Sequence, residues 1–292
     1  MAFLNKITGL FSSSLPNRLY NQWLSFPPVQ ASVNYFAKLL IPATIKIAEG
    51  ELMLNRQDVG VSFAMAFGLF EKTEVAIFQK TLKPAMNVLD IGANIGYYTV
   101  IAGKLIGPTG KVFAFEPEKT NATILKKNLA INKLSNVVVE EQAVSDTVGE
   151  RTFFLAENNK GAHAFVNNRN TNEKIIVKTD TVDHALSKYG SPKIDIIKMD
   201  IEGAEVLALE GMLQTIACNP ELIIFTEFYP KALNRLEKSP LEFLNRLKEL
   251  GFNLFEINED VRQLVPLTDF NKFISEFPDY ECAKNIYATK IK

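Results

Sequence analysis

The stretch Val88-Leu89-Asp90-Ile91-Gly92-Ala93-Asn94-Ile95-Gly96 decides the fold. A short apolar run leads into a turn with two glycines, and residues 97–105 continue with apolar side chains at helical spacing. Residues 111–115 then predict a second strand, and residues 120–132 a second helix. Strand, turn, helix and strand within about thirty residues are typical of a parallel crossover unit.

Apolar runs continue this series along the rest of the chain. Further strands are predicted at residues 137–140, 194–199, 222–226, 252–257 and 285–289, with helices at 204–216 and 240–250. Several runs are apolar on both faces, as in strands that helices cover on either side. The sequence therefore predicts an α/β fold with a mostly parallel seven-stranded sheet and helices on both faces.

Two segments fall outside this repeating pattern. An insertion at about residues 150–185 contains predicted strands at 151–155 and 174–178 around a polar loop. Ligands of open α/β sheets bind at the carboxyl ends of the strands, so the insertion is well placed to shape a substrate pocket. A solvated hairpin without a role is the alternative.

Residues 1–50 form a predicted N-terminal appendage, partly helical, before a domain at 51–292. One side of a short helix is expected to carry apolar residues: Phe3, Leu4, Ile7, Leu10 and Phe11. This side could face the body of the protein, a partner chain or a membrane surface. Self-association and peripheral membrane contact therefore both stay open for this segment.

The overall composition excludes several classes of protein. The 292 residues are 47% hydrophobic, which excludes disorder as the main state. The 32 basic and 33 acidic residues nearly cancel, so a role in coating nucleic acid is not expected. Two cysteines and two histidines are too few and too separated for a zinc cluster, and we expect no metal site. We expect a cytoplasmic protein.

The glycine turn itself suggests a ligand. Asp90 stands two residues before Gly92, and Gly96 follows after a four-residue interval, which differs from the G-x-G-x-x-G pattern for pyrophosphate. An acid in this place suits a cofactor with an ammonium or sulfonium charge and would repel a diphosphate. Glu116 follows the second strand and could accept both ribose hydroxyls of an adenosine-containing ligand.

Three stretches of the chain closely resemble the FkbM family of S-adenosylmethionine-dependent methyltransferases: residues 88–99, Phe115-Glu116-Pro117, and Lys198-Met199-Asp200-Ile201-Glu202-Gly203-Ala204-Glu205. The resemblance extends from about residue 51 to 290. It implies a Rossmann-like class I methyltransferase fold and S-adenosylmethionine as cofactor. It also implies O-methylation of a small-molecule or glycan-like acceptor.

The resemblance also implies a set of cofactor-binding residues: Asp90, Gly92, Asn94, Gly96 and Glu116. Ala93, Tyr98 and Pro117, which lie within the matching stretches, are further candidates. Gln142, after the third strand, is our candidate for the adenine edge, with Asp146 as the alternative. The chain departs from the family within the insertion. Gly161-Ala162-His163-Ala164 stands where the family commonly has small hydroxyl residues after the glycine.

Asp200 is the first candidate for the base that removes a proton from an acceptor hydroxyl, followed by Glu202, His163 and Glu227. Glu202 lies just before a predicted helix, where negative charge is also favourable for structural reasons. Two other functions stay open. One is a non-catalytic cofactor-binding or scaffolding protein, and the other is an NAD-dependent oxidoreductase.

Overall fold

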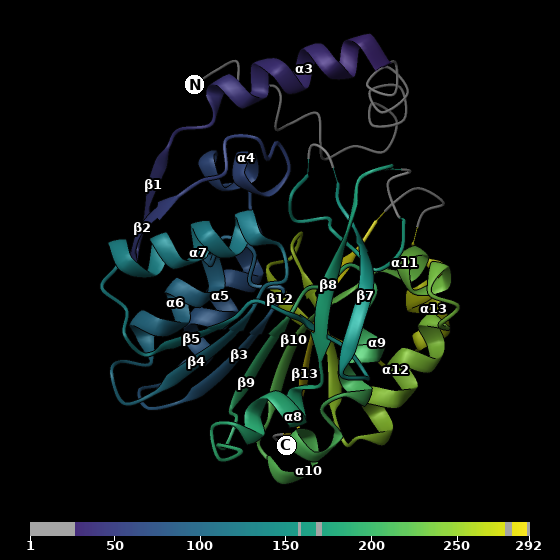
Figure 1. The fold of residues 1–292 in the computed structure, drawn as a ribbon. Coiled ribbons are helices and arrows are strands. Elements are labelled where there is room, and N and C mark those ends of the chain that lie inside the picture. The colour runs from purple at the N-terminus through teal and green to yellow at the C-terminus, as the bar shows by residue number, and fades with distance from the viewer. Residues whose placement is uncertain (1–26, 157–158, 168–170, 278–281, 291–292) are drawn as a thin grey trace.

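The computed structural model describes residues 27–156, 159–167, 171–277 and 282–290. In these ranges, eight strands form one central sheet (Figure 1). From one edge of the sheet to the other, they are β12 (Gln263–Pro266), β11 (Asn253–Asn258), β13 (Lys284–Thr289), β10 (Ile223–Phe228), β9 (Ile196–Met199), β3 (Asn87–Ile91), β4 (Lys111–Phe115) and β5 (Val137–Glu140).

Five adjacent strands, β10, β9, β3, β4 and β5, run parallel to one another. The chain runs outward from β3 through β4 to β5, and then returns to the other side of β3 with β9 and β10. The strand order therefore reverses between β3 and β9. In an open α/β sheet, such a reversal leaves a crevice at the carboxyl ends of the two strands, where ligands bind.

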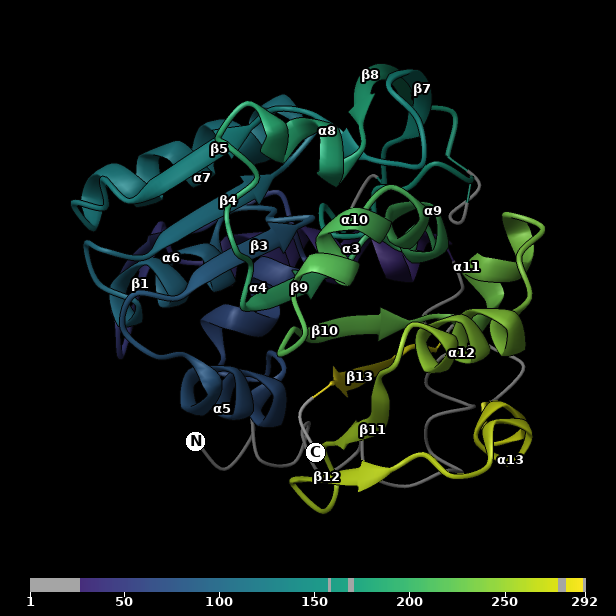
Figure 2. The same ribbon diagram turned by 90° about the horizontal axis from the view of Figure 1, so that it is seen from below.

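The other end of the sheet is antiparallel, because β13 pairs in opposite directions with both β10 and β11 (Figure 2). The expected seven strands are present, and β12 adds an eighth, antiparallel to β11. The predicted number of strands was therefore one too low. β12 is an edge strand of only four residues that ends in Pro266, and a proline in a short apolar run argues against a strand in the sequence.

Helices cover both faces of the sheet, which confirms the predicted Rossmann-like fold. One face carries α5 (Lys72–Thr81), α6 (Tyr97–Leu105) and α7 (Lys119–Ile131). The other carries α8 (Val182–Ser187), α9 (Glu205–Glu210), α10 (Leu213–Cys218), α11 (Pro230–Arg235), α12 (Pro240–Glu249) and α13 (Phe270–Ser275).

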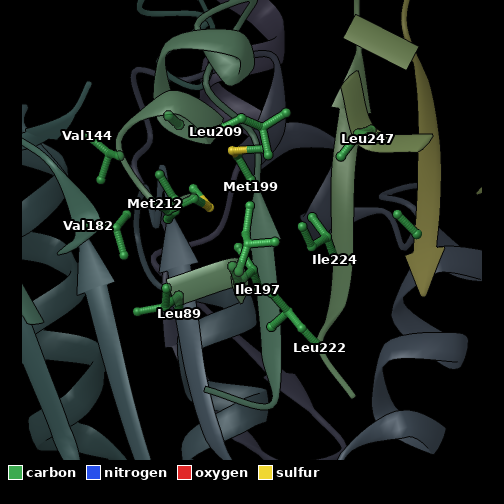
Figure 3. Packing of buried hydrophobic residues seen from close by; sticks show 14 of the residues in the cluster. Leu89, Val144, Val182, Ile197, Met199, Leu209, Met212, Leu222, Ile224 and Leu247 are labelled. Atoms are coloured by element: carbon green, nitrogen blue, oxygen red, sulfur yellow. The ribbon is translucent and has the colours of Figure 1, made fainter. Parts of the chain in front are cut away.

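Successive side chains of each strand point to opposite faces of the sheet, so the hydrophobic core is divided between the two faces. Leu89 and Ile197 pack beneath Leu209 and Met212 in the larger cluster (Figure 3). Their neighbours in sequence turn the other way, so Val88 packs toward α5 and α6.

The helix predicted at residues 204–216 is in fact two short helices, α9 and α10. A β-carbon on Gly211 would lie 2.1 Å from the backbone oxygen of Ser145, so the chain passes too close there for a side chain. The Asp183 carboxylate then accepts hydrogen bonds from the amides of Gln214 and Thr215 at 2.9 and 2.8 Å. These bonds start a new helix after the break.

The insertion forms a separate small sheet in the order β6 (Ala143–Val144), β8 (Lys174–Asp180) and β7 (Gly149–Phe154). The last two pair antiparallel and correspond to the two predicted strands. The loop between them reaches the carboxyl ends of β3 and β4, where Gly161 approaches Asn94. The insertion therefore forms one wall of the crevice.

Before the sheet, the chain forms α3 (Pro27–Leu40), the hairpin of β1 (Thr44–Ile47) and β2 (Gly50–Met53), and α4 (Val61–Ala66). Ile41 is buried against Leu54, Met65 and Ile95. The helix predicted around Phe3 to Phe11 lies outside the described residues, and a domain boundary at residue 50 stays a prediction. Among the helices that the structure describes, none has both the length and the apolar character needed to cross a membrane.

Candidate functional site

The turn after β3 has backbone conformations that require its glycines. Gly92 has φ +84° and Gly96 has φ +91°, in the left-handed region that side chains disfavour. A β-carbon on Gly92 would lie 2.0 Å from the backbone oxygen of Asp200, at the end of β9. One on Gly96 would lie 2.4 Å from Leu125 Cδ1 in α7. The two glycines thus let the turn pack directly against the end of β9 and the side of α7.

Glu116 connects the turn after β3 to the turn after β4. Its side chain is buried after β4, where Oε2 accepts a hydrogen bond from the Asn94 amide at 2.9 Å and Oε1 accepts one from the Glu118 amide at 2.8 Å. Burial raises the pKa of Glu116 to about 7, although both amides oppose the shift. The carboxyl group therefore fixes both turns at the sheet edge.

A first cleft opens beside this carboxyl group, between the sheet edge and the insertion. Its lining includes Gly92, Asn94, Glu116, Pro117, Asn121 and His163. Asn121 is buried in α7 and donates through Nδ2 to the Lys160 backbone oxygen at 3.1 Å. Its Oδ1 has no hydrogen-bond partner among the described residues. A buried amide oxygen in this position can accept a hydrogen bond from a ligand.

His163 enters the first cleft from the insertion. The ring is buried, and Nδ1 accepts a hydrogen bond from the Ala156 amide at 2.8 Å. Burial, with the nearby Lys160 charge, lowers the pKa of His163 to about 4. A neutral ring that accepts at Nδ1 carries its proton on Nε2. In this arrangement His163 offers a donor to a ligand and has no free nitrogen lone pair for a base.

A second cleft adjoins the first. The two clefts share four lining residues: Gly92, Asn94, Gly161 and Asp200. The second cleft is also lined by Ala93, Tyr98, Lys198 and four further acids: Glu71, Asp90, Glu202 and Glu227. Two ligands could thus meet at the glycine turn, one in each cleft.

Asp90 is buried near the end of β3, where its carboxylate accepts a hydrogen bond from the Thr99 hydroxyl of α6. Burial raises the pKa of Asp90 to about 6, and the bond from Thr99 opposes this shift. Near neutral pH, Asp90 is therefore mostly ionised and can stabilise a positive charge in the second cleft.

A buried cation lies beneath these acids. The Lys198 Nζ atom is 3.2 Å from Glu74 Oε1 and 3.9 Å from Asp200 Oδ2, and lies 4.8 Å from the centre of the Tyr98 ring. Burial lowers the pKa of Lys198, but the charges of Glu74, Glu71 and Asp200 outweigh burial and raise it overall. The ammonium group is therefore held charged.

Lys198 and Glu74 were not predicted as site residues from the sequence. A lysine between Ile197 and Met199 in the predicted strand is the signal that could have identified Lys198, because a buried charge needs a partner. The sequence does not show that this partner is Glu74.

Asp200, Glu202 and Glu227 lie together at the ends of β9 and β10 and line the second cleft. The Asp200 side chain is 32% exposed and reaches both clefts. Burial raises its pKa, and the Lys198 charge opposes this. Burial also raises the pKa of Glu227, and the neighbouring acids add to the shift. Glu227 Oε2 is buried with no hydrogen-bond partner within the described part of the chain.

A family model, the methyltransferase FkbM domain, matches residues 90–254, more than half of the chain. The chain belongs to the FkbM methyltransferase family. The predicted family and fold are thereby confirmed. The matched segment of this FkbM domain contains both turns, the insertion, and strands β9 and β10.

Individual relatives are more distant. Methyltransferase sdnD of Sordaria araneosa is 28% identical over 43% of this chain and 60% of its own length. The "Probable cobalt-precorrin-6B C(15)-methyltransferase (decarboxylating)" of Sulfurisphaera tokodaii is 39% identical over 23% of this chain and 35% of its own. A solved structure of a SAM-dependent O-methyltransferase from Thermotoga maritima has 14% identity and a TM-score of 0.43, covering 85% of each chain. The FkbM chain therefore spans less than two thirds of these two curated relatives.

Two predicted cofactor residues have side chains that line neither cleft. Gln142 donates through Nε2 to Asp180 Oδ2 at 3.2 Å, and Asp146 accepts from Arg151 Nη2 at 2.7 Å. Their adenine-binding role stays a prediction. The other predicted residues meet at the clefts, except Gly96, which shapes the turn.

Proposed function

We propose that this FkbM protein transfers a methyl group from S-adenosylmethionine to a hydroxyl group of a small-molecule or glycan-like acceptor. The observation that carries the proposal is the continuity of the two clefts at Gly92, Asn94 and Asp200. Family membership supports methyl transfer as the reaction. One cleft would hold the donor, and the other the acceptor.

The first cleft fits the adenosine part of the cofactor. Each Glu116 oxygen accepts one backbone amide, which leaves further lone pairs for ribose hydroxyls. Asn121 Oδ1 and His163 Nε2 offer an acceptor and a donor to the remaining polar edges.

The charged part of the cofactor would lie toward the second cleft. When bound, S-adenosylmethionine supplies an electrophilic methyl group on a sulfonium ion. Asp90, which lines the second cleft, is the acid that can stabilise its positive charge. Lys198 lies 3.9 Å from Asp200, and the charge of Lys198 is balanced by Glu74 at 3.2 Å.

Transfer to a hydroxyl also requires that the acceptor lose its proton. We propose Asp200 as the base, since it reaches both clefts and its raised pKa makes it a stronger base than an ordinary aspartate. Glu202 and Glu227 are the alternatives in the second cleft. His163 fits a donor role better, because its Nδ1 is already occupied.

The proposal separates into two experiments. Calorimetric titration of the pure protein is expected to detect S-adenosylmethionine and its demethylated product S-adenosylhomocysteine, and no NAD. Binding of NAD alone would favour the oxidoreductase alternative. Binding of S-adenosylmethionine without methyl transfer to any acceptor in the second experiment would favour a scaffolding role.

The second experiment identifies the acceptor. The protein is incubated with isotopically labelled S-adenosylmethionine and separate metabolite, glycan, RNA and protein fractions, because one relative is named a ribosomal protein L11 methyltransferase. Label is expected in the metabolite or glycan fraction. Asp200→Asn should lose transfer and keep most cofactor affinity, whereas the exposed Asp260→Asn control should keep both. Label confined to RNA or protein would overturn the proposed acceptor class.

A further inference from the structure

The lining of the second cleft divides into a polar group and an apolar group. The polar group consists mainly of acids near the ends of strands β3, β9 and β10: Asp90, Asp200, Glu202 and Glu227. The apolar group comes from α4, the segment after it and the first residue of α6: Val61, Met65, Phe70 and Tyr97. A molecule that is polar at one end and apolar at the other would match both groups.

An apolar groove continues from the second cleft. The groove and the cleft share three lining residues, Met65, Phe70 and Tyr97. The further apolar lining of the groove comes from β1, α4 and α5: Ile45, Ile47, Ala66 and Val75. Among the described residues that line the groove, none is acidic, whereas five acids line the cleft. The apolar character of the cleft therefore increases toward the groove.

Packing holds the walls of the groove in place. Met65 and Val75 are buried, whereas Ile47 is half-buried. The rings of Phe70 and Tyr97, which line both the cleft and the groove, meet edge to face with their centroids 5.5 Å apart. A preformed apolar hollow binds an apolar ligand because binding removes half-exposed side chains and the ligand itself from water.

The continuity with the second cleft indicates what occupies the groove. The groove shares no lining residue with the first cleft, where the adenosine part of the donor is proposed to bind. A group that enters the groove is therefore expected to belong to the acceptor. A sugar would leave the apolar walls without a matching surface. An aliphatic chain would match them, and the stems of the exposed Lys46 and Lys72 can cover such a chain while their ammonium groups stay in water.

We propose that the acceptor is an amphiphile with a fatty acyl chain. Its hydroxyl-bearing polar end would bind beside Asp200 in the second cleft, and its chain would extend past Phe70 and Tyr97 into the groove. This inference rests on the proposed methyl transfer to a hydroxyl group. It narrows the acceptor from small molecules and glycans in general to those that carry a lipid chain.

Two ligands with the same polar end test the groove by itself. Methyl β-D-glucoside and octyl β-D-glucoside differ only in the length of the alkyl chain. Calorimetric titration measures both in the presence of S-adenosylhomocysteine, below the concentration at which the octyl compound forms micelles. Each buried methylene group strengthens binding by about fourfold, so octyl glucoside should bind at least about tenfold more tightly. Equal affinity for the two glucosides, or no binding of octyl glucoside, would overturn the proposal.

The variant Ala66→Asp places a carboxylate in the groove, at a residue that lines neither cleft. It should weaken octyl glucoside binding at least about tenfold and keep the affinity for S-adenosylhomocysteine, which also shows that the variant folds. Val148→Asp is the matched control, because Val148 is 61% exposed and does not line the groove. Equal affinities of the two variants for octyl glucoside would overturn the proposal. A concentration-dependent dimer that Ala66→Asp loses, without a preference for the octyl chain, would assign the groove to a second copy instead.

The solubility of the methylated product separates this inference from the proposed function. Products formed from labelled S-adenosylmethionine and a metabolite extract are divided between chloroform and water. We expect label in the chloroform phase, and less of it with Ala66→Asp than with Val148→Asp. Label confined to the water phase would overturn the lipid-chain acceptor and leave methyl transfer standing. Absence of label from both phases would overturn the proposed function, and this acceptor with it.

Discussion

Replacement of Gly92 by alanine tests the structural basis of the glycine turn. Two costs are expected. The left-handed conformation at φ +84° costs a residue with a β-carbon roughly 1–2 kcal/mol. The new β-carbon would also lie 2.0 Å from the Asp200 backbone oxygen, so the ends of β3 and β9 must separate.

The second cost resembles overpacking of a core, which destabilises by about 1–3 kcal/mol. Gly92→Ala should therefore lower the free energy of unfolding by roughly 2–5 kcal/mol in total. Gly251→Ala is the matched control, because Gly251 has φ +92° and no atom within 4 Å of an added β-carbon among the described residues. It bears only the conformational cost.

Urea unfolding followed by circular dichroism measures both variants, and calorimetric titration with S-adenosylmethionine measures the cleft. Gly92→Ala should be the less stable of the two and should bind the cofactor more weakly, while Gly251→Ala keeps its affinity. Equal stability and equal affinity of the two variants would refute the reasoning. The close approach of the turn to β9 would then impose no constraint.

Three further predictions concern the buried titratable groups. Lys198→Met should lower the free energy of unfolding by about 3–5 kcal/mol, because Glu74 loses its cation. Adding Glu74→Gln should recover part of this loss, and a double variant no more stable than the single one would contradict the pairing. Affinity for S-adenosylmethionine should fall below about pH 6 as Asp90 becomes protonated, and calorimetry on Asp90→Asn should show a flatter profile. An unchanged profile in that variant would exclude Asp90 as the group responsible. His163→Ala should lose about 1–3 kcal/mol of stability, since the Ala156 amide loses its acceptor. Its pH–rate profile should keep any limb near neutrality, because the His163 pKa is about 4, and loss of such a limb would contradict this assignment.

The first crossover unit could be predicted from the sequence almost to the residue. The predicted helix at 97–105 and strand at 111–115 have the bounds of α6 and β4. Their signals are local, since apolar runs and glycines act within a few residues. The break at Gly211 could not be predicted, because it depends on Ser145, a residue distant in sequence.

The candidate site shows the same division. Asp90, Gly92 and Glu116 were predicted because they directly follow or end apolar strands. Lys198 stands out in its strand as a charge that needs a partner, but its partner Glu74 lies on α5, and no local pattern reveals that β9 passes this helix. Side-chain direction is also beyond a strand pattern. Gln142 has the predicted place in the chain, but its amide turns to Asp180.

The loop of the insertion is held from two sides by its backbone. The Lys160 amide donates to Asp58 Oδ1 at 3.0 Å, and the Lys160 carbonyl accepts from Asn121 at 3.1 Å. Exchanging this loop between relatives, as a way to engineer new acceptor specificity, would therefore require Asp58 and Asn121 to be transplanted with it. A chimera without these two residues would lack both hydrogen bonds that hold the loop beside the glycine turn.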